Sequence, residues 1–202
     1  DGARWVWRSE LLRPIMFTSI AWNIAWFMLQ ATYVPYAIHD LGLDAGGVGV
    51  TLAAYGVGMI VGALLAPRVV ALLPFGQAIL LGPYFSVLAA LTMAMTLVWP
   101  QGWLAGLSYF LFGAGPIIWT ITSTTLRQTV TPRAMIGRVS SINIVVSTGA
   151  RPLGAALGGL VGVYFPVSVS LWCVVLGFGL QALIISASRV RTLQRLPDPL
   201  PD

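Results

Sequence analysis

The chain has 202 residues, of which 57% are hydrophobic and only 8% are charged. Soluble domains carry about 25% charged residues, so this composition excludes an ordinary soluble domain and indicates a polytopic membrane protein. All eleven basic residues are arginines, and they lie in short clusters between apolar runs, which favours contact with lipid phosphates over nucleic acid. The single cysteine, Cys173, excludes a disulfide within the chain.

Apolar runs long enough to cross a hydrocarbon core of about 30 Å recur along the sequence. Charges and turn residues divide it into six predicted transmembrane helices, at about 14–38, 45–67, 75–98, 103–126, 138–164 and 167–188. The runs lack the two-residue alternation of membrane strands, and their connections are too short for a soluble domain. We therefore predict an all-α fold in which residues 1–202 form a single six-helix transmembrane bundle.

The arginines also predict the orientation of this bundle. If six helices are threaded alternately, every arginine except Arg151 falls on one side of the membrane, and none falls on the other. Arginine-rich loops mark the cytoplasmic side. The pattern predicts cytoplasmic tails at residues 1–13 and 189–202, with both termini inside.

Three of the predicted helices carry polar and aromatic residues along one face. These stripes include Asn23, Trp26, Gln30 and Tyr33 on the first helix, Phe112, Trp119 and Thr122 on the fourth, and Asn143, Ser147 and Arg151 on the fifth. A single hydroxyl or amide in a membrane helix usually bonds to a neighbouring helix. Aromatic rings beside hydrogen-bonding groups on three helices favour a cavity that binds an amphipathic organic molecule, and all ten residues are candidates to line its substrate pathway.

Arg151 is the most demanding of these residues. It lies thirteen residues beyond Arg138, about 20 Å along a helix, and therefore near the middle of the membrane. A charge at that depth costs at least ~2.5 kcal/mol and must face protein, water or an opposite charge. No Asp or Glu lies within the six predicted helices. Arg151 could bond to backbone carbonyls and Asn143, but we favour an anionic group of the substrate or a carboxylate from another segment.

Flexible points accompany two of these stripes. Pro152 follows Arg151 directly and predicts a kink, because proline removes a backbone donor inside the helix. Gly113, Gly115 and Pro116 provide a second flexible point in the fourth predicted helix. We expect these residues to act as hinges of a gate.

Residues 125–162, "TLRQTVTPRAMIGRVSSINIVVSTGARPLGAALGGLVG", resemble the tenth and eleventh helices of the major facilitator superfamily. Residues 41–69, "LGLDAGGVGVTLAAYGVGMIVGALLAPRV", resemble its eighth helix, and the bacterial exporter branch related to siderophore efflux is most similar. The resemblance implies helices seven to twelve of a twelve-helix carrier, built as two inverted three-helix repeats, in a bacterial inner membrane. It also implies a gating role for Arg68, although the acidic residue usual in that loop is absent.

We thus expect the C-terminal half of a secondary active exporter that moves a small organic molecule by alternating access. The expected partners are the substrate, an N-terminal six-helix half, the lipid bilayer and, if transport is proton-coupled, protons titrating a carboxylate outside this chain. The alternative is a self-contained six-helix channel or assembly subunit that closes its cavity by homodimerisation. The sequence has no nucleophile elbow, no metal-binding cluster and no paired carboxylates within the predicted helices. We therefore expect neither an enzyme nor a metal or cofactor site.

Overall fold

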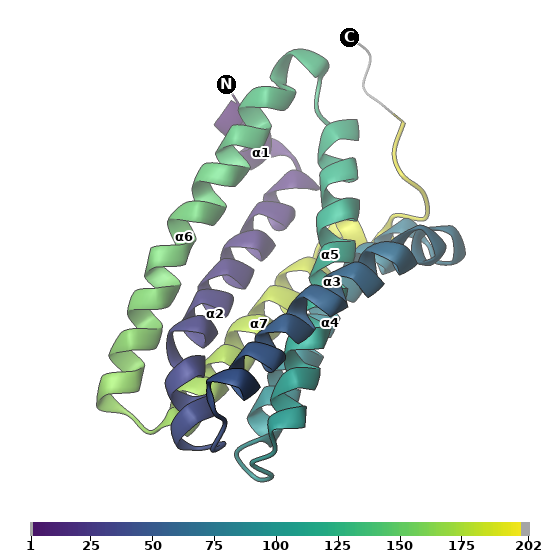
Figure 1. Cartoon of the computed structure of the whole chain (residues 1–202). Coiled ribbons are helices and arrows are strands. Elements are labelled where there is room, and N and C mark those ends of the chain that lie inside the picture. Colours follow the sequence, from purple (N-terminus) through teal and green to yellow (C-terminus); the bar gives the residue numbers. More distant parts are fainter. Residues whose placement is uncertain (1, 199–202) are drawn as a thin grey trace.

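The computed structural model describes residues 2–198, which form helices and connecting turns without a strand. Six helices are long: α2 (Leu12–His39), α3 (Ala45–Leu72), α4 (Phe75–Met95), α5 (Gly102–Thr129), α6 (Ile136–Tyr164) and α7 (Val167–Ser186) (Figure 1). Three short elements accompany them: α1 (Gly2–Arg8) and the 3₁₀ turns η1 (Arg133–Met135) and η2 (Arg189–Thr192). The all-α fold is confirmed.

Five of the long helices, α3 to α7, are long and apolar enough to cross a membrane. The sixth, α2, has 28 residues but is not apolar enough by the same measure, because Asn23, Gln30 and two tryptophans interrupt its apolar run. It nevertheless packs lengthwise between α6 and α7. Pro14 is accommodated in its first turn, where a backbone N–H has no helical partner anyway.

The helix ends follow the expected turn chemistry, with one clear difference. The Asp44 side chain accepts a hydrogen bond of 2.7 Å from Gly47 N and so caps α3, just after a turn in which Gly42 has a φ of 65°. At its other end α3 continues through Pro67 and Arg68 to Leu72, five residues beyond the predicted end at 67. Proline removes only one donor there, and that stretch of α3 has few neighbours.

The helix contacts have an internal two-fold pattern. In this pattern α2 corresponds to α5, α3 to α6, and α4 to α7. The contact between α3 and α5 then corresponds to that between α6 and α2, and the contact between α4 and α5 to that between α7 and α2. The contact between α4 and α7 corresponds to itself. These are the five most extensive helix contacts in residues 2–198. The pattern is that of two inverted three-helix repeats, as predicted.

Glycines make two of these contacts equivalent in detail. A Cβ on Gly58 or Gly62 would collide with the backbone of Phe110 or Ala114, and one on Gly154 or Gly158 would collide with that of Ile24 or Met28. Both α3 and α6 therefore approach their partner helix through a small-xxx-small face. The two glycine pairs are offset by the same 96 positions (154 − 58 and 158 − 62), which fixes the register of the repeat.

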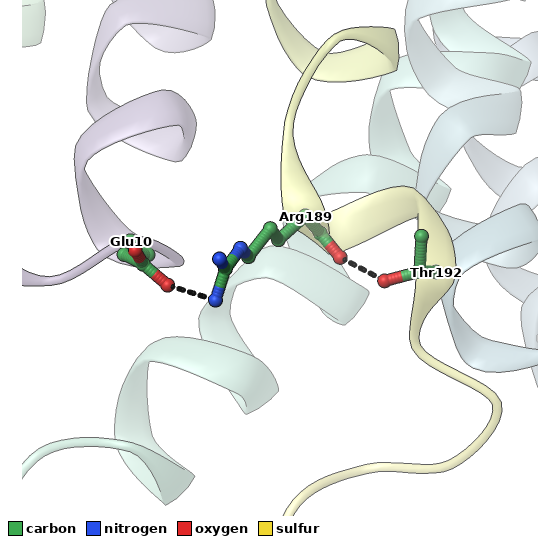
Figure 2. A network of polar contacts seen from close by, with 3 residues as sticks. All are labelled: Glu10, Arg189 and Thr192. Atoms are coloured by element: carbon green, nitrogen blue, oxygen red, sulfur yellow. Dashed lines mark hydrogen bonds and ion pairs between the residues drawn. The ribbon is translucent and has the colours of Figure 1, made fainter.

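All arginine-bearing connections meet at one end of the bundle. Gly76 N, after the α3–α4 turn, donates to Leu193 O over 2.8 Å, and Val6 packs with Leu12 and Val139 beside the α5–α6 connection. Arg189 and Glu10 form an exposed ion pair of 2.6 Å that links η2 to the start of α2 (Figure 2). The predicted tails are thus partly ordered, as α1 and η2; residues 1 and 199–202 lie outside the described part.

Candidate functional site

A cavity of about 190 Å³ opens near the middle of the bundle, between α2, α3, α5 and α6. It lies between the two glycine-mediated helix pairs, α3–α5 and α2–α6, each of which joins one helix from each repeat. Its lining is Ser19, Trp22, Asn23, Tyr55, Met59, Gly113, Pro116, Ile117, Trp119, Thr120, Ser147 and Arg151. No acidic residue is among them.

Arg151 is held at the α2–α6 side of this cavity by two contacts. Its Nε donates to Asn23 Oδ1 over 3.1 Å, and its guanidinium carbon lies 5.4 Å from the centre of the Phe27 ring. Asn23 Nδ2 donates to Ser19 O over 2.9 Å, which turns the amide oxygen toward the arginine. Among residues 2–198, nothing bonds to the two terminal nitrogens of Arg151 and no carboxylate pairs with it.

Aromatic rings form a stacked column beside the cavity. Trp22 and Trp26 stack with ring centres 5.4 Å apart, and Trp26 stacks on Tyr55 at 5.2 Å. Trp22 and Tyr55 line the cavity, whereas Trp26 lies behind them, 7% exposed and edge-on to Phe112 at 5.0 Å. The column therefore joins α2 to α3 and buttresses the cavity wall.

The structure brings only part of the predicted pathway together. Asn23, Trp119, Ser147 and Arg151 line the cavity. The hydroxyls of Tyr33 and Thr51 bond to each other in the core, Tyr109 donates to Gln30 Oε1 over 2.7 Å, and Phe112 is fully buried. Thr122 donates to its own helix, and Asn143 lines a much smaller cavity near Arg127, so these residues and Trp26 lie outside the cavity that Arg151 lines.

The stripe on α5 differs most from its predicted orientation. Ser108 donates to Ala89 O on α4 over 2.7 Å, and a Cβ on Gly115 would collide with Phe85, also on α4. Most of this face therefore packs against α4, and Trp119 reaches the cavity from its edge. Helical periodicity identifies such a face but does not identify the neighbour that covers it.

The predicted hinge and gating residues occupy three environments: the cavity wall, the contact with α4 in which Gly115 is packed, and the exposed surface. Gly113 and Pro116 line the cavity, and Gly113 lies against the backbone of Tyr55. Pro152 lies on the exposed side of α6 beside Arg151, and Arg68 is exposed near the end of α3. Only the first two are placed to couple movement of α5 directly to the shape of the cavity.

Sequence reasoning missed Tyr55 and Met59 as lining residues. The offset of 96 positions between the glycine pairs could have identified Tyr55, because it gives Tyr55 the same position in the first repeat that Arg151 has in the second. Trp22 lies one turn before Trp26 on the same helix and also lines the cavity. Within residues 2–198, His, Cys, Asp and Glu form no group that could hold a metal ion.

Comparison with known proteins identifies the family. A family model described as "Transmembrane secretion effector", within the major facilitator superfamily, matches residues 1–198. The enterobactin exporter EntS of Citrobacter koseri is 32% identical over 165 residues, which are 79% of this chain and 38% of that protein.

A solved structure has the same fold. The crystal structure of a mutant of the peptide transporter POT in complex with sulfate superimposes with a TM-score of 0.73 at 18% identity, over 93% of this chain and 40% of the transporter. The chain thus spans about two fifths of both relatives. It is a partial, half-sized unit of a transporter fold, and it belongs to the transmembrane secretion effector family of the major facilitator superfamily.

Proposed function

We propose that this chain acts as the C-terminal half of a secondary active exporter, which moves a small organic molecule out of a bacterial cytoplasm. The observation that carries the proposal is the cavity between α2, α3, α5 and α6, where a mid-helix arginine retains free donors. Polar groups at that depth are costly in a membrane and are usually retained for function. The similarity to an enterobactin exporter supports the direction of transport.

Alternating access would use the internal symmetry of the half. The cavity lies between the α3–α5 and α2–α6 pairs, which are related by the inverted repeat. Rocking of this half against an N-terminal half about the midplane would open the cavity toward one side of the membrane while closing it on the other. Gly113 and Pro116 would supply the flexibility on α5.

The bundle would require a second half to complete the pathway. α3 and α6 are the least buried membrane helices, and large apolar side chains such as Val57, Ile60, Val145 and Leu153 are exposed on them. We propose that an N-terminal six-helix half covers these faces. The alternative is that a second copy of the chain covers them. Cysteine crosslinking from position 60 or 145 in the full-length protein distinguishes the two arrangements. Links within one polypeptide support the exporter, whereas links between copies support the dimer.

We further propose that the arginine-rich end faces the cytoplasm of an inner membrane, with both termini inside. Ten arginines at one end match the rule that cytoplasmic loops are positively charged. Because α2 to α7 contain no Asp or Glu, any proton-titrating carboxylate would belong to the other half.

Transport into inverted membrane vesicles tests the exporter directly. Vesicles that contain the full-length protein should accumulate a compound placed outside them, and accumulation should collapse when the ion gradients are dissipated. Passive, gradient-independent flux would support the channel alternative and contradict the proposal.

A further inference from the structure

The two glycine-mediated helix pairs, α2–α6 and α3–α5, supply chemically different walls to the cavity between them. On the α2–α6 side lie Arg151, Asn23 and Ser147, which offer hydrogen bonds and one permanent charge. On the α3–α5 side lie Tyr55, Met59, Ile117 and Trp119, which offer rings and apolar side chains. Thr120 also lines this side, but its hydroxyl already donates to Pro116 O over 2.9 Å, and the ring of Trp22 on α2 adds a further aromatic surface to the cavity. At equivalent positions of the two repeats the side chains differ most in charge, because Tyr55 on α3 corresponds to Arg151 on α6.

From this contrast we infer that the cavity binds an amphipathic organic anion in a fixed orientation. Its carboxylate or comparable anionic group contacts Arg151, and its planar apolar body lies against Tyr55, Met59 and Trp119. The inference rests on the proposed transport function and specifies the class of substrate.

The charge on Arg151 requires an acceptor that residues 2–198 do not supply. Asn23 and the Phe27 ring position the guanidinium through Nε and one face, and they leave the outer edge, with its two terminal nitrogens, free. That edge is the geometry that pairs with a planar carboxylate through two parallel hydrogen bonds. No carboxylate lines the cavity, so the ligand itself would neutralise the arginine.

The α3–α5 side of the cavity suits the planar apolar part of such a ligand. Trp26 stacks on both Trp22 and Tyr55, so these rings are held as a rigid wall instead of collapsing into the cavity. Met59 and Ile117 add apolar surface without hydrogen-bonding groups. The cavity of about 190 Å³ is smaller than the ~300–1,000 Å³ typical of ligand sites, so this half would cover only one side of the ligand.

A matched pair of probes tests the inference. 2-Naphthoate and 2-naphthamide share one ring system and differ in charge, and their binding to the purified full-length protein is measured by equilibrium dialysis. We expect naphthoate to bind at least about tenfold more tightly. Arg151→Gln should remove most of this preference by weakening naphthoate binding far more than naphthamide binding, whereas Tyr55→Ala should weaken both probes.

Arg195→Gln is the matched control, because it removes the same charge from an exposed position beyond η2. Equal binding of the two probes, binding of neither, or an unchanged preference in Arg151→Gln would overturn the inference. A carboxylate of the facing half that neutralises Arg151 would produce the first or second result. These results would leave the exporter proposal standing if vesicles that contain the wild-type protein still accumulate other compounds, whereas a failure of the wild-type protein to transport any compound would refute that proposal instead.

Discussion

Arg151 on α6 and Asn23 on α2 are joined by a hydrogen bond of 3.1 Å that crosses between the two repeats. The Nε of Arg151 donates to the amide oxygen of Asn23, and the orientation of that amide is set by Asn23 Nδ2, which donates to Ser19 O. A neutral acceptor therefore orients the cation without cancelling its charge. This combination suits a site in which the charge must remain free for a ligand.

Asn23→Asp converts this neutral contact into an ion pair and should separate stability from transport. The new carboxylate would pair with Arg151 at the membrane interior and raise thermal stability in detergent. It would also compete with an anionic substrate, and the apparent affinity measured in transport assays should fall about tenfold. Asn23→Ser, which adds no charge, is the control; equal effects of both substitutions on affinity would contradict competition by charge.

Trp26→Ala should primarily damage the fold. Its ring is 7% exposed and contacts Trp22, Tyr55, Tyr109 and Phe112. Removal of a buried tryptophan typically costs about 3–5 kcal/mol, and unfolding in mixed micelles should show a loss of that order. Trp22→Ala, at the cavity wall, should cost less stability and reduce transport more. The reverse ranking would mean that Trp26, not Trp22, is the wall that a ligand contacts.

The glycine contacts predict equivalent effects in the two repeats. Gly58→Val and Gly154→Val would each push a side chain into the backbone of the facing helix, at Phe110 and Ile24 respectively. Overpacking of this kind costs about 1–3 kcal/mol, so both variants should unfold at lower temperature in detergent. Gly179→Val on α7 meets open space and should have little effect. A large difference between the first two variants would argue against equivalent repeats.

The ion pair between Glu10 and Arg189 should contribute little to stability (Figure 2). Both side chains are exposed, at 60% and 75%, and such pairs are worth about 0.2–1 kcal/mol and are screened by salt. Glu10→Gln should therefore lower the melting temperature in detergent slightly at low ionic strength and not at high ionic strength. A large loss that persists in high salt would assign Glu10 a different structural role.

The sequence predicted the architecture better than the site. Apolar run lengths and arginine positions define the six helices, since the bilayer imposes both a length and a charge asymmetry on any chain that crosses it. The glycine spacing indicates the internal repeat, because the close contact with the facing backbone leaves no room for a Cβ at Gly58 or Gly154. These constraints are local in the sequence and can be read from it.

The environment of each cavity residue could not be read in the same way. Trp22 and Trp26 are four residues apart on one helix face, yet one lines the cavity and the other is enclosed by rings from α3 and α5. Ser108 and Gly115 share a stripe with Trp119, yet they pack against α4. The helix that covers a given face depends on the angles at which the helices cross. The helical periodicity of one segment of sequence contains no information on those angles.

Transport by Arg151→Gln and Arg151→Lys, at matched membrane levels and with a compound that the wild-type full-length protein exports, tests the central claim most directly. Gln should abolish export without reducing the amount of protein in the membrane. Lys should restore it only in part, because a point charge lacks the planar fork of arginine. Undiminished export by Arg151→Gln would contradict the claim that this cavity is the substrate pathway.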